Sequence, residues 1–373
     1  MKLSLLQENL NSALSHVSRF VSPKTHLPIL SNILFSTDSG RLKLTATNLE
    51  IGINYWLGAK IETEGSFAIP SKEISEFISY LPSGKIDLIL DDQRLLKLSS
   101  PKAESVFSTS PDADFPQLSS LDPSFSLELD SEILRQTVSQ IAFAAATDDS
   151  RPVLTAVYCL FSPDKLTIVG TDGFRLSLKE IKMVNPLDLA GKESLIYLIP
   201  SRSLVEISKL AKPNSKIKFG PTSDQNQLVF VMDDVELVSR LIEGEYPDYH
   251  RIIPESFSTK IFLNREEFAQ AIKMASVFAR ESANVVKFSI KQNSLEISSN
   301  APQLGQNKIT IDARIEGDPL DIAFNYKFVS DYLGVASGEE VIIELNESLS
   351  PGLFRDQADP SLIHIIMPVR IQD

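Results

Sequence analysis

The residue types that most often carry out catalysis are few in this chain and are not grouped. The histidines are His16, His26, His250 and His364. None lies three or four residues from another, the spacing that places two ligands on one helix face. Strings that hold zinc, phosphate or a serine nucleophile, such as HExxH, CxxC, GxGxxG and GxSxG, do not occur. The pairs Asp148-Asp149 and Asp233-Asp234 offer carboxylates, but adjacent acids in a loop are usually solvated, so we predict no metal and no cofactor.

The segment GTDGFRL, residues 170–176, comes closest to an active-site motif. Two interpretations stay open at this point. Asp172 and Gly173 favour a tight turn between two strands. An enzyme that used this loop would instead lose turnover when Asp172 or Arg175 is changed. We expect the turn, and therefore a protein that is not an enzyme.

Length and composition limit what can position these residues. A chain of 373 residues exceeds one ordinary core, so two or three domains are expected. Its 43% hydrophobic and 23% charged residues are typical of a soluble globular protein. Cys159, within the apolar run AVYCLF, is predicted to be a buried small hydrophobe. No signal-peptide region or bilayer-length apolar stretch is present, which favours a cytoplasmic protein.

The net charge of −13 argues against tight sequence-specific DNA binding. Such proteins gain most of their affinity by neutralising phosphates and normally show a basic footprint. Any contact with DNA must therefore be local, weak or topological.

The chain repeats itself at offsets of roughly 120–135 residues. Each third opens with a short alternating strand that continues into an amphipathic helix: LSLLQENLNSAL, LELDSEILRQTV and IFLNREEFAQAI. The equivalent apolar positions are Leu3, Leu127 and Ile261, and then Leu10, Leu134 and Phe268. Ser131 and Asn264 are predicted to cap the second and third of these helices.

A second helix is predicted in the middle of each third, from IPSKEISEFISYL, IPSRSLVEISKLA and FNYKFVSDYLGVA. The aligned residues are Pro70, Pro200 and Asn325, followed two residues later by Lys72, Arg202 and Lys327. A cation in the first turn opposes the helix dipole. Its recurrence indicates an anionic partner, although a solvated lysine explains any single instance.

Strand-like segments with turn residues separate the helices. Each third ends with a similar sequence: DADFPQL, GEYPDYHRIIP and IIMPVRI. The hairpin turns are expected at residues 38–40, 162–164 and 292–294. We predict three α+β domains, residues 1–122, 123–252 and 253–373, each with two helices packed on antiparallel sheet, because βαβα alternation is absent.

These repeats, together with TDGFRL, GEYPDYHRIIP, HLPILSNILF, DADFP, SRPVLTAV and MPVRI in this order, resemble the bacterial DNA polymerase III beta subunit, the beta sliding clamp, over the whole chain. The resemblance implies a DNA-clamp fold in which a head-to-tail homodimer forms a six-domain ring around duplex DNA. The helices would line the hole and the sheets would form the outer wall. Such a processivity factor has no catalytic activity and tethers polymerase, clamp loader and repair proteins.

The resemblance also implies three sets of site residues. Phosphate contacts without sequence specificity are expected from Lys24, Lys72, Arg202 and Lys209. The dimer interface is expected to include Phe107, Val277 and Phe278. A pocket between the second and third domains, for a peptide with a Gln followed by leucines and a phenylalanine, is expected to use Arg151, Leu154, Thr171, Gly173, Phe174, Arg175, Leu176, Pro247, Arg251, Ile252, Asn325, Phe328, Met367, Pro368, Val369 and Arg370.

Alternatives remain for parts of this interpretation. Leu154, Leu176 and Ile252 could instead be simply core residues. Phe174 and Phe328 replace a histidine and a tyrosine that are common in the family, and Ile371-Gln372-Asp373 extends past the common end, so the peptide preference is open. Glu73 replaces a basic residue expected at the dimer contact. The main rival is a repeat scaffold that binds peptides as a monomer and never encloses DNA.

Overall fold

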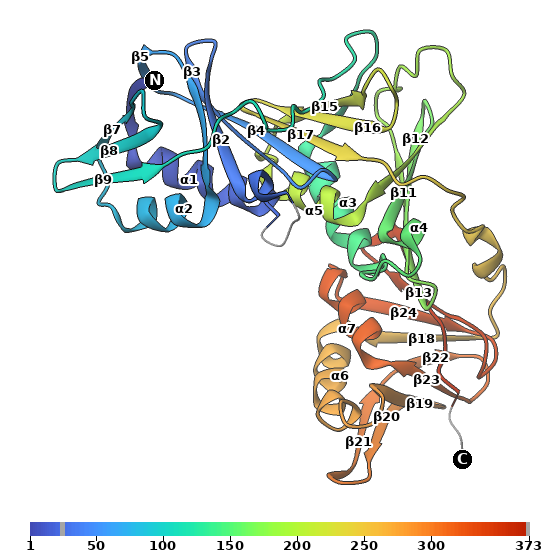
Figure 1. Cartoon of the computed structure of the whole chain (residues 1–373). Helices are drawn as coiled ribbons and strands as arrows, with labels where there is room; N and C mark the ends of the chain where they lie inside the picture. Colours follow the sequence, from blue (N-terminus) through green and yellow to red (C-terminus); the bar gives the residue numbers. More distant parts are fainter. Residues whose placement is uncertain (23–26, 371–373) are drawn as a thin grey trace. The chain divides into compact units, whose positions relative to one another are not determined.

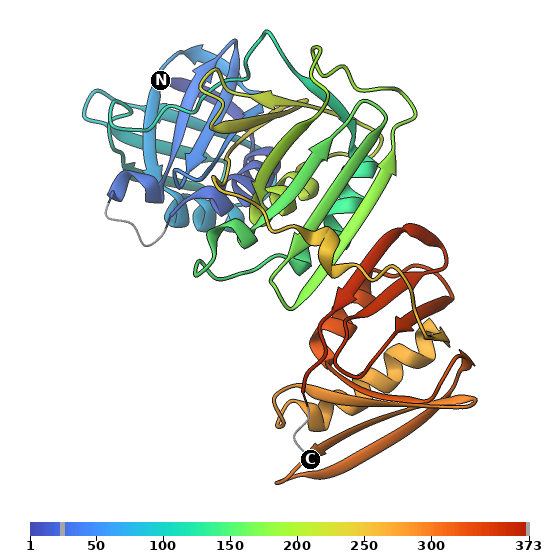
Figure 2. The same ribbon diagram turned by 90° about the vertical axis from the view of Figure 1, so that its right-hand side faces the viewer.

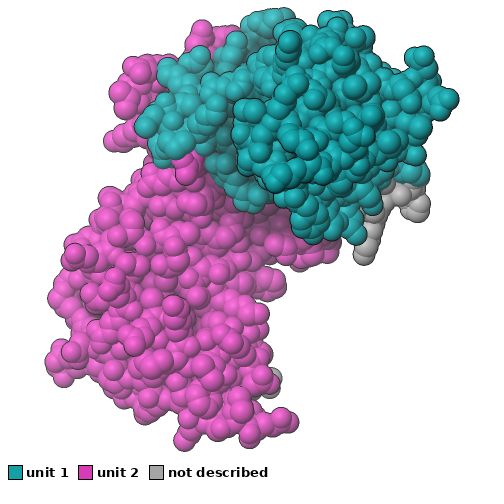
Figure 3. All heavy atoms as spheres, turned by 90° about the vertical axis from the view of Figure 1, so that its left-hand side faces the viewer, with its two compact units in different colours: residues 1–132, 206–241 teal, residues 133–205, 242–373 magenta. Residues whose placement is uncertain are grey.

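The structure is a computed structural model that describes residues 1–22 and 27–370. The chain divides into two compact units (Figure 3). Unit 1 comprises residues 1–132 and 206–241, and unit 2 comprises residues 133–205 and 242–373. Each unit therefore contains part of the second third of the sequence.

The described residues of unit 1 form two antiparallel sheets. The first has the order β5-β1-β7-β8-β9, with bounds Lys60–Thr63, Lys2–Leu6, Lys85–Leu90, Leu95–Ser100 and Ala103–Ser108. The second has the order β10-β15-β16-β17-β4-β3-β2-β6, with bounds Leu127–Asp130, Lys216–Pro221, Gln227–Met232, Val235–Arg240, Ile51–Leu57, Arg41–Thr47, Asn32–Asp38 and Ser66–Pro70.

Unit 2 also has two antiparallel sheets among its described residues. The larger has the order β14-β11-β12-β13-β26-β25-β24-β18-β22, with bounds Leu195–Pro200, Ala156–Phe161, Lys165–Thr171, Arg175–Lys182, Asp359–Ile366, Gly352–Asp356, Glu340–Leu345, Thr259–Asn264 and Arg314–Glu316. The smaller has the order β21-β20-β19-β23, with bounds Gly305–Asp312, Ser294–Ala301, Val285–Lys291 and Leu320–Asn325.

Two main helices occur in each third of the sequence, as predicted (Figure 1). They are α1 Gln7–Val17 and α2 Ser71–Tyr80, α3 Ser131–Ile141 and α5 Ser201–Leu210, and α6 Arg265–Ala279 and α7 Tyr326–Val335. Shorter helices are α4 Pro152–Thr155, η1 Ser18–Phe20, η2 Pro28–Ser31, η3 Ala142–Ala144 and η4 Tyr249–Ile252. In unit 1, α1 packs on β3, β4 and α2; in unit 2, α6 packs on β20, β21 and α7 (Figure 2).

The periodicity predicted the core positions of the repeats correctly. The strand positions Leu3, Leu127 and Ile261 and the helix positions Leu10, Leu134 and Phe268 are all buried. The predicted hairpin turns are also present, since they separate β2 from β3, β11 from β12 and β19 from β20. Cys159 is buried as expected, and burial raises the pKa of its thiol to about 12. Among residues 1–22 and 27–370, no helix combines the length and apolar character needed to cross a membrane.

One predicted helix cap was wrong by one residue. Asn264 caps α6 as predicted, because its side chain accepts two backbone N–H groups of the first turn. At α3, however, the Oδ1 of Asp130 accepts the Glu132 N–H at 2.8 Å. Ser131 is instead the first helical residue, and its Oγ accepts the N–H of Ser215 at 3.1 Å. The cap must precede the helix, and a carboxylate there also suits the helix dipole.

The repeats are joined by the same pair of strands each time. In unit 1, β4 of the first third pairs with β17, the last strand of the second third. In unit 2, β13 of the second third pairs with β26, the last strand of the third. By position in the repeat, β4, β13 and β21 are equivalent, as are β9, β17 and β26. Strands β9 and β21 end their sheets and have no neighbour on one side among the described residues.

Candidate functional site

The turn at residues 171–175 in unit 2 is held by its own side chains. Asp172 Oδ1 accepts the N–H groups of Phe174 at 2.9 Å and Arg175 at 3.0 Å. Thr171 Oγ1 accepts the Gly173 N–H at 3.1 Å and donates to the Arg175 carbonyl at 2.6 Å. Gly173 has φ +87°, which favours glycine. The predicted turn is therefore confirmed, and the Asp172 carboxylate serves as a backbone acceptor.

The first third contains the same turn, which the sequence analysis missed. Asn48 Oδ1 accepts the N–H groups of Glu50 and Ile51, and Thr47 Oγ1 accepts the Leu49 N–H at 3.0 Å. Leu49 has φ 74°, close to that of Gly173. The signal was a Thr followed by Asn or Asp at equivalent repeat positions.

In both turns the position five residues after the threonine is covered by another side chain. A Cβ at Gly52 would lie 2.5 Å from Cδ2 of Leu118, so this leucine already fills the space beside the first turn. Beside the second turn, Leu176 occupies the position equivalent to Gly52 and is buried with Tyr249 and Ile365. The residues two positions earlier, Glu50 in the first turn and Phe174 in the second, are both exposed, and the second is apolar.

Phe174 and Met367 form an exposed apolar shelf beside the second turn. Strands β13 and β26 pair in register up to Arg175 and Ile366. The Met367 N–H then donates to the Phe174 carbonyl at 2.9 Å, so these two residues lie opposite each other. Their exposed fractions are 66% for Phe174 and 37% for Met367. Fixed backbones present both side chains outward, as a binding surface requires.

The C-terminal segment continues along the shelf. Its position is set by the Val369 N–H, which donates to the Ala323 carbonyl at 2.8 Å. Pro368 and Val369 are half-buried and Arg370 is exposed. The segment 371–373 lies outside the described residues, so the extended ending noted from the sequence is not placed.

Arg175 contacts four different groups within unit 2. Its guanidinium donates to Asp172 Oδ2 at 3.1 Å, to Asp331 Oδ2 at 2.5 Å and to the Phe143 carbonyl at 2.7 Å. It also lies 4.5 Å from the centre of the Phe328 ring. Arg175 and Phe328 are thus brought together as the sequence suggested, and the arginine joins the second third of the chain to α7.

The other predicted groove residues fall into two groups. Leu154, Thr171 and Leu176 are buried, and Ile252 is half-buried against Leu176 and its neighbours, so these residues lie mainly in the core. The exposed residues of the set are Arg151, Gly173, Pro247 and Arg251. Arg251 donates to Asp248 at 2.9 Å, and the Arg151 guanidinium lies beside Gly173. Asn325 caps α7, because its side chain accepts the Lys327 N–H at 3.0 Å.

A buried ion pair that the sequence analysis missed lies where β13 meets β26. The Lys179 Nζ is 2.8 Å from Asp359 Oδ2 and 2.5 Å from Gln140 Oε1. The Lys179 side chain is only 7% exposed. In the sequence, Lys179 occupies a polar position of the alternation Leu176-Ser177-Leu178-Lys179, and only the structure shows that both faces of β13 are buried here. The sequence could not identify the partner, which lies 180 residues away.

Acid should weaken the ion pair between Lys179 and Asp359. Burial alone raises the pKa of Asp359, but hydrogen bonds from Lys179, Ser361 and Gln140 outweigh it and hold the pKa below its ordinary value. A depressed folded-state pKa adds stability above the unfolded pKa of about 3.9, and this stability is lost as pH falls through the folded value. We expect the urea midpoint of the protein to fall below about pH 4. The fall should be shallower in Asp359→Asn, and equal slopes in both proteins would contradict this expectation.

The remaining predicted residues that the structure describes lie on helices and on the edge strand β9. Lys72 and Arg202 are exposed in the first turns of α2 and α5. Lys209, also on α5, is 2.8 Å from Glu206, while Lys24 lies outside the described residues. Phe107 on β9 contacts Phe77 of α2, with ring centres 5.3 Å apart. On α6, Val277 is exposed and Phe278 is half-buried; Glu73 is exposed on α2.

No group of His, Cys, Asp and Glu among the described residues is arranged to hold a metal ion. Repeated sheet-and-helix domains joined edge to edge, with an exposed apolar pair beside a turn held by its own side chains, define a clamp-type protein. The family models of the DNA polymerase III beta subunit match as the N-terminal domain over residues 1–119, the central domain over 128–248 and the C-terminal domain over 250–370. The chain belongs to the DNA polymerase III beta subunit family, and its fold is that of a sliding clamp.

Similar proteins match over the full length. The beta sliding clamp of Bacillus subtilis is 32% identical over 381 residues, which covers 99% of this chain and 100% of that protein. The beta sliding clamp of Synechococcus elongatus is 29% identical, with 100% of both chains covered. The crystal structure of the Bacillus subtilis DNA polymerase sliding clamp superposes with a TM-score of 0.93 at 31% identity, and covers 100% of both chains.

Proposed function

We propose that this protein is the processivity factor of a bacterial replicative DNA polymerase, which encircles duplex DNA and tethers other proteins to it. Family membership over the whole chain supports this function. The protein would perform no chemistry itself, because its role is to hold partners on DNA by enclosure. Replication in the cytoplasm is the setting that this role implies.

The main support for ring closure by two copies is that equivalent strands pair between successive repeats. Within the chain, β4 pairs with β17 and β13 pairs with β26. The equivalent strands left over are β21 in the third domain and β9 in the first, and each has one edge that no other described strand pairs with. Pairing β21 of one copy with β9 of the next would repeat the same joint and satisfy both edges.

The domains proposed for this ring are residues 1–122, 123–252 and 253–373, so two copies would supply six. Phe107 on β9 and the α6 residues Val277 and Phe278 would lie at the joint between copies. Val277 is an exposed apolar side chain, which such a contact would bury.

DNA would be held by weak contacts inside this ring. Lys72, Arg202 and Lys209 lie on helices and would meet phosphates, with Lys24 as a further candidate. Phosphate contacts carry no sequence information, so the ring would slide. The acidic charge of the whole chain is compatible with this mode, because retention comes from closure.

The shelf of Phe174 and Met367, with the floor of Leu154, Thr171 and Leu176, is the proposed docking groove. It would receive a short peptide with a Gln followed by leucines and a phenylalanine, from polymerase, clamp-loader and repair proteins. Apolar anchors dominate affinity in grooves of this kind. Methionine suits a surface that accepts several partners.

Retention on DNA tests this function. A ring loaded onto a nicked circular duplex should stay bound in high salt and leave once the circle is cut, because only closure holds it. An ordinary electrostatic binder would leave both forms as salt rises. The measurement is gel filtration of labelled protein with circular and linearised DNA. Equal loss from both forms, together with a monomeric mass at micromolar concentration, would favour the monomeric peptide scaffold instead.

A further inference from the structure

Glu206 in unit 1 binds two cations at once. It lies on α5, one turn before Lys209, and its Oε1 is 2.8 Å from the Lys209 Nζ. Its Oε2 is 3.4 Å from Nη1 of Arg19, in η1 directly after α1. The Glu206 side chain is 15% exposed, whereas both cations are about half exposed. One sheltered carboxylate therefore holds two outward cationic side chains.

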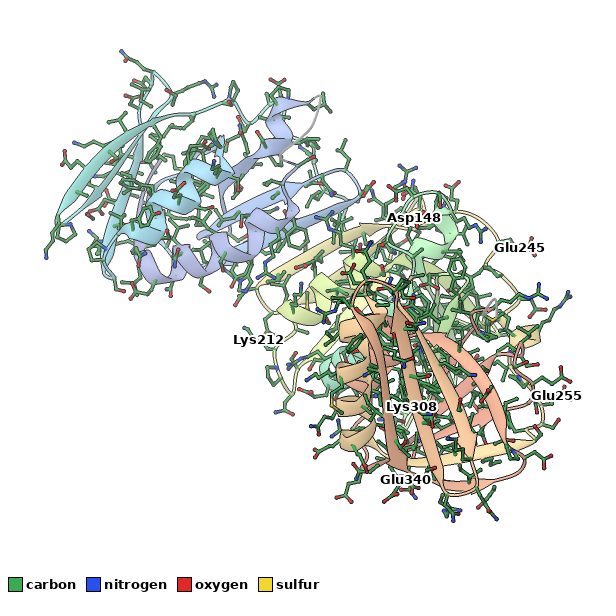
Figure 4. All side chains as sticks on the ribbon, turned by 90° about the horizontal axis from the view of Figure 1, so that it is seen from below. Asp148, Lys212, Glu245, Glu255, Lys308 and Glu340 are labelled. Atoms are coloured by element: carbon green, nitrogen blue, oxygen red, sulfur yellow. The ribbon has the colours of Figure 1, made fainter. Side chains whose placement is uncertain are left out.

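A neighbouring cation is paired in a similar way, but others are not. Lys212, labelled in Figure 4, lies just after α5 and is 3.1 Å from Asp233 and 3.8 Å from Asp234. Lys72, in contrast, makes no ion pair with another described residue. The cationic side chains on or beside the helices thus differ in how readily they can bind an external anion, because some already pair with a carboxylate.

Glu206 keeps its charge in this setting. Burial alone raises the pKa of its carboxyl, but the hydrogen bonds and charges of Lys209 and Arg19 outweigh burial and hold the pKa below its ordinary value. An ionised carboxylate competes with any phosphate for the same two side chains. The three residues together carry one net positive charge.

We propose that Glu206 is a positioning residue that weakens the grip of Arg19 and Lys209 on DNA phosphates. The inference rests on the proposed enclosure of DNA, because only then do these side chains meet a duplex. Each phosphate neutralised by a cation adds about 0.9 to the slope of log affinity against log salt concentration. By occupying two cations, Glu206 lowers that slope, and a ring that is held by closure slides with less resistance.

The test compares Glu206→Gln with the matched variant Glu128→Gln. Glu128 pairs with Lys216 at 3.3 Å between two strands, and both partners are exposed. Each substitution removes one negative charge and releases a lysine, but only Glu206 lies on a helix with the proposed DNA contacts. Binding to a labelled duplex of about 30 base pairs, long enough to cover several phosphate contacts, is measured by fluorescence anisotropy at a series of salt concentrations.

We expect Glu206→Gln to steepen the salt slope by about 1–2 and to tighten binding roughly 3- to 10-fold at low salt. Glu128→Gln should stay within about 2-fold of the original protein. In the double variant Glu206→Gln with Lys209→Gln, most of the gain should disappear. Equal shifts in both single variants would show an effect of net charge, and no shift in Glu206→Gln would show a structural role; either result overturns the proposal.

Two further measurements distinguish a failure of this inference from a loss of the fold and from a failure of DNA enclosure. Thermal unfolding of each variant confirms that the fold is retained, since a stability change alone does not alter a salt slope. Retention of the original protein on closed circles tests enclosure itself. If the original protein is retained while Glu206→Gln leaves the slope unchanged, the proposed function stands and this inference fails.

Discussion

Lys179→Ala should lower the free energy of unfolding by about 3–5 kcal/mol. Its side chain is 7% exposed, and its ammonium hydrogen-bonds to Asp359 and Gln140. Removal leaves the Asp359 carboxylate, itself 14% exposed, without its cation. A buried charge that loses its partner costs far more than the pair contributed. Denaturant unfolding of the full-length protein measures the loss.

Lys165→Ala is the matched control for this prediction. Lys165 also lies on a strand of the same sheet, and its Nζ is 2.8 Å from Glu180, the same distance as in the buried pair. Lys165 and Glu180 are both about half exposed, and such pairs contribute about 0–1 kcal/mol. Similar losses in the two variants would show that burial does not decide the effect, and our account of the joint would be wrong.

The double variant Phe174→Ala with Met367→Ala should weaken peptide binding roughly 30- to 150-fold, or about 2–3 kcal/mol. The two side chains are exposed and opposite each other on backbones fixed by the 2.9 Å hydrogen bond between them. They are the apolar groups that a ligand can bury without disturbing the core. A synthetic peptide with a Gln followed by leucines and a phenylalanine, titrated by calorimetry, provides the measurement.

Val184→Ala is the matched control, because Val184 is 93% exposed and lies outside the proposed groove. It should leave peptide affinity unchanged. The melting temperature of the double variant should also change little, since exposed side chains contribute little to folding. Undiminished peptide binding by the double variant would mean that the peptide docks elsewhere on the chain.

The periodicity of the sequence determined much of the architecture. Alternation at Leu3 and its equivalents marked strands, and helical spacing at Leu10 and its equivalents marked helices, because each pattern reports which side of a local element faces the core. The threefold repeat and the turn at Asp172-Gly173 were also predicted from the local sequence. The family resemblance, carried by ordered motifs, led to a fold that the full-length matches confirm.

The side-chain partners were decided by tertiary structure alone. Arg175 was expected in the peptide pocket, and the structure shows that it binds Asp331 and the Phe143 carbonyl, which lie far from it in sequence. Leu154 and Leu176 are buried, which agrees with the alternative that they are core residues. Leu118 fills the space beside Gly52 in the first turn, and Tyr249 packs with Leu176 at the equivalent position of the second turn. Local spacing specifies which face of an element is apolar; strand pairing over more than a hundred residues decides what that face meets.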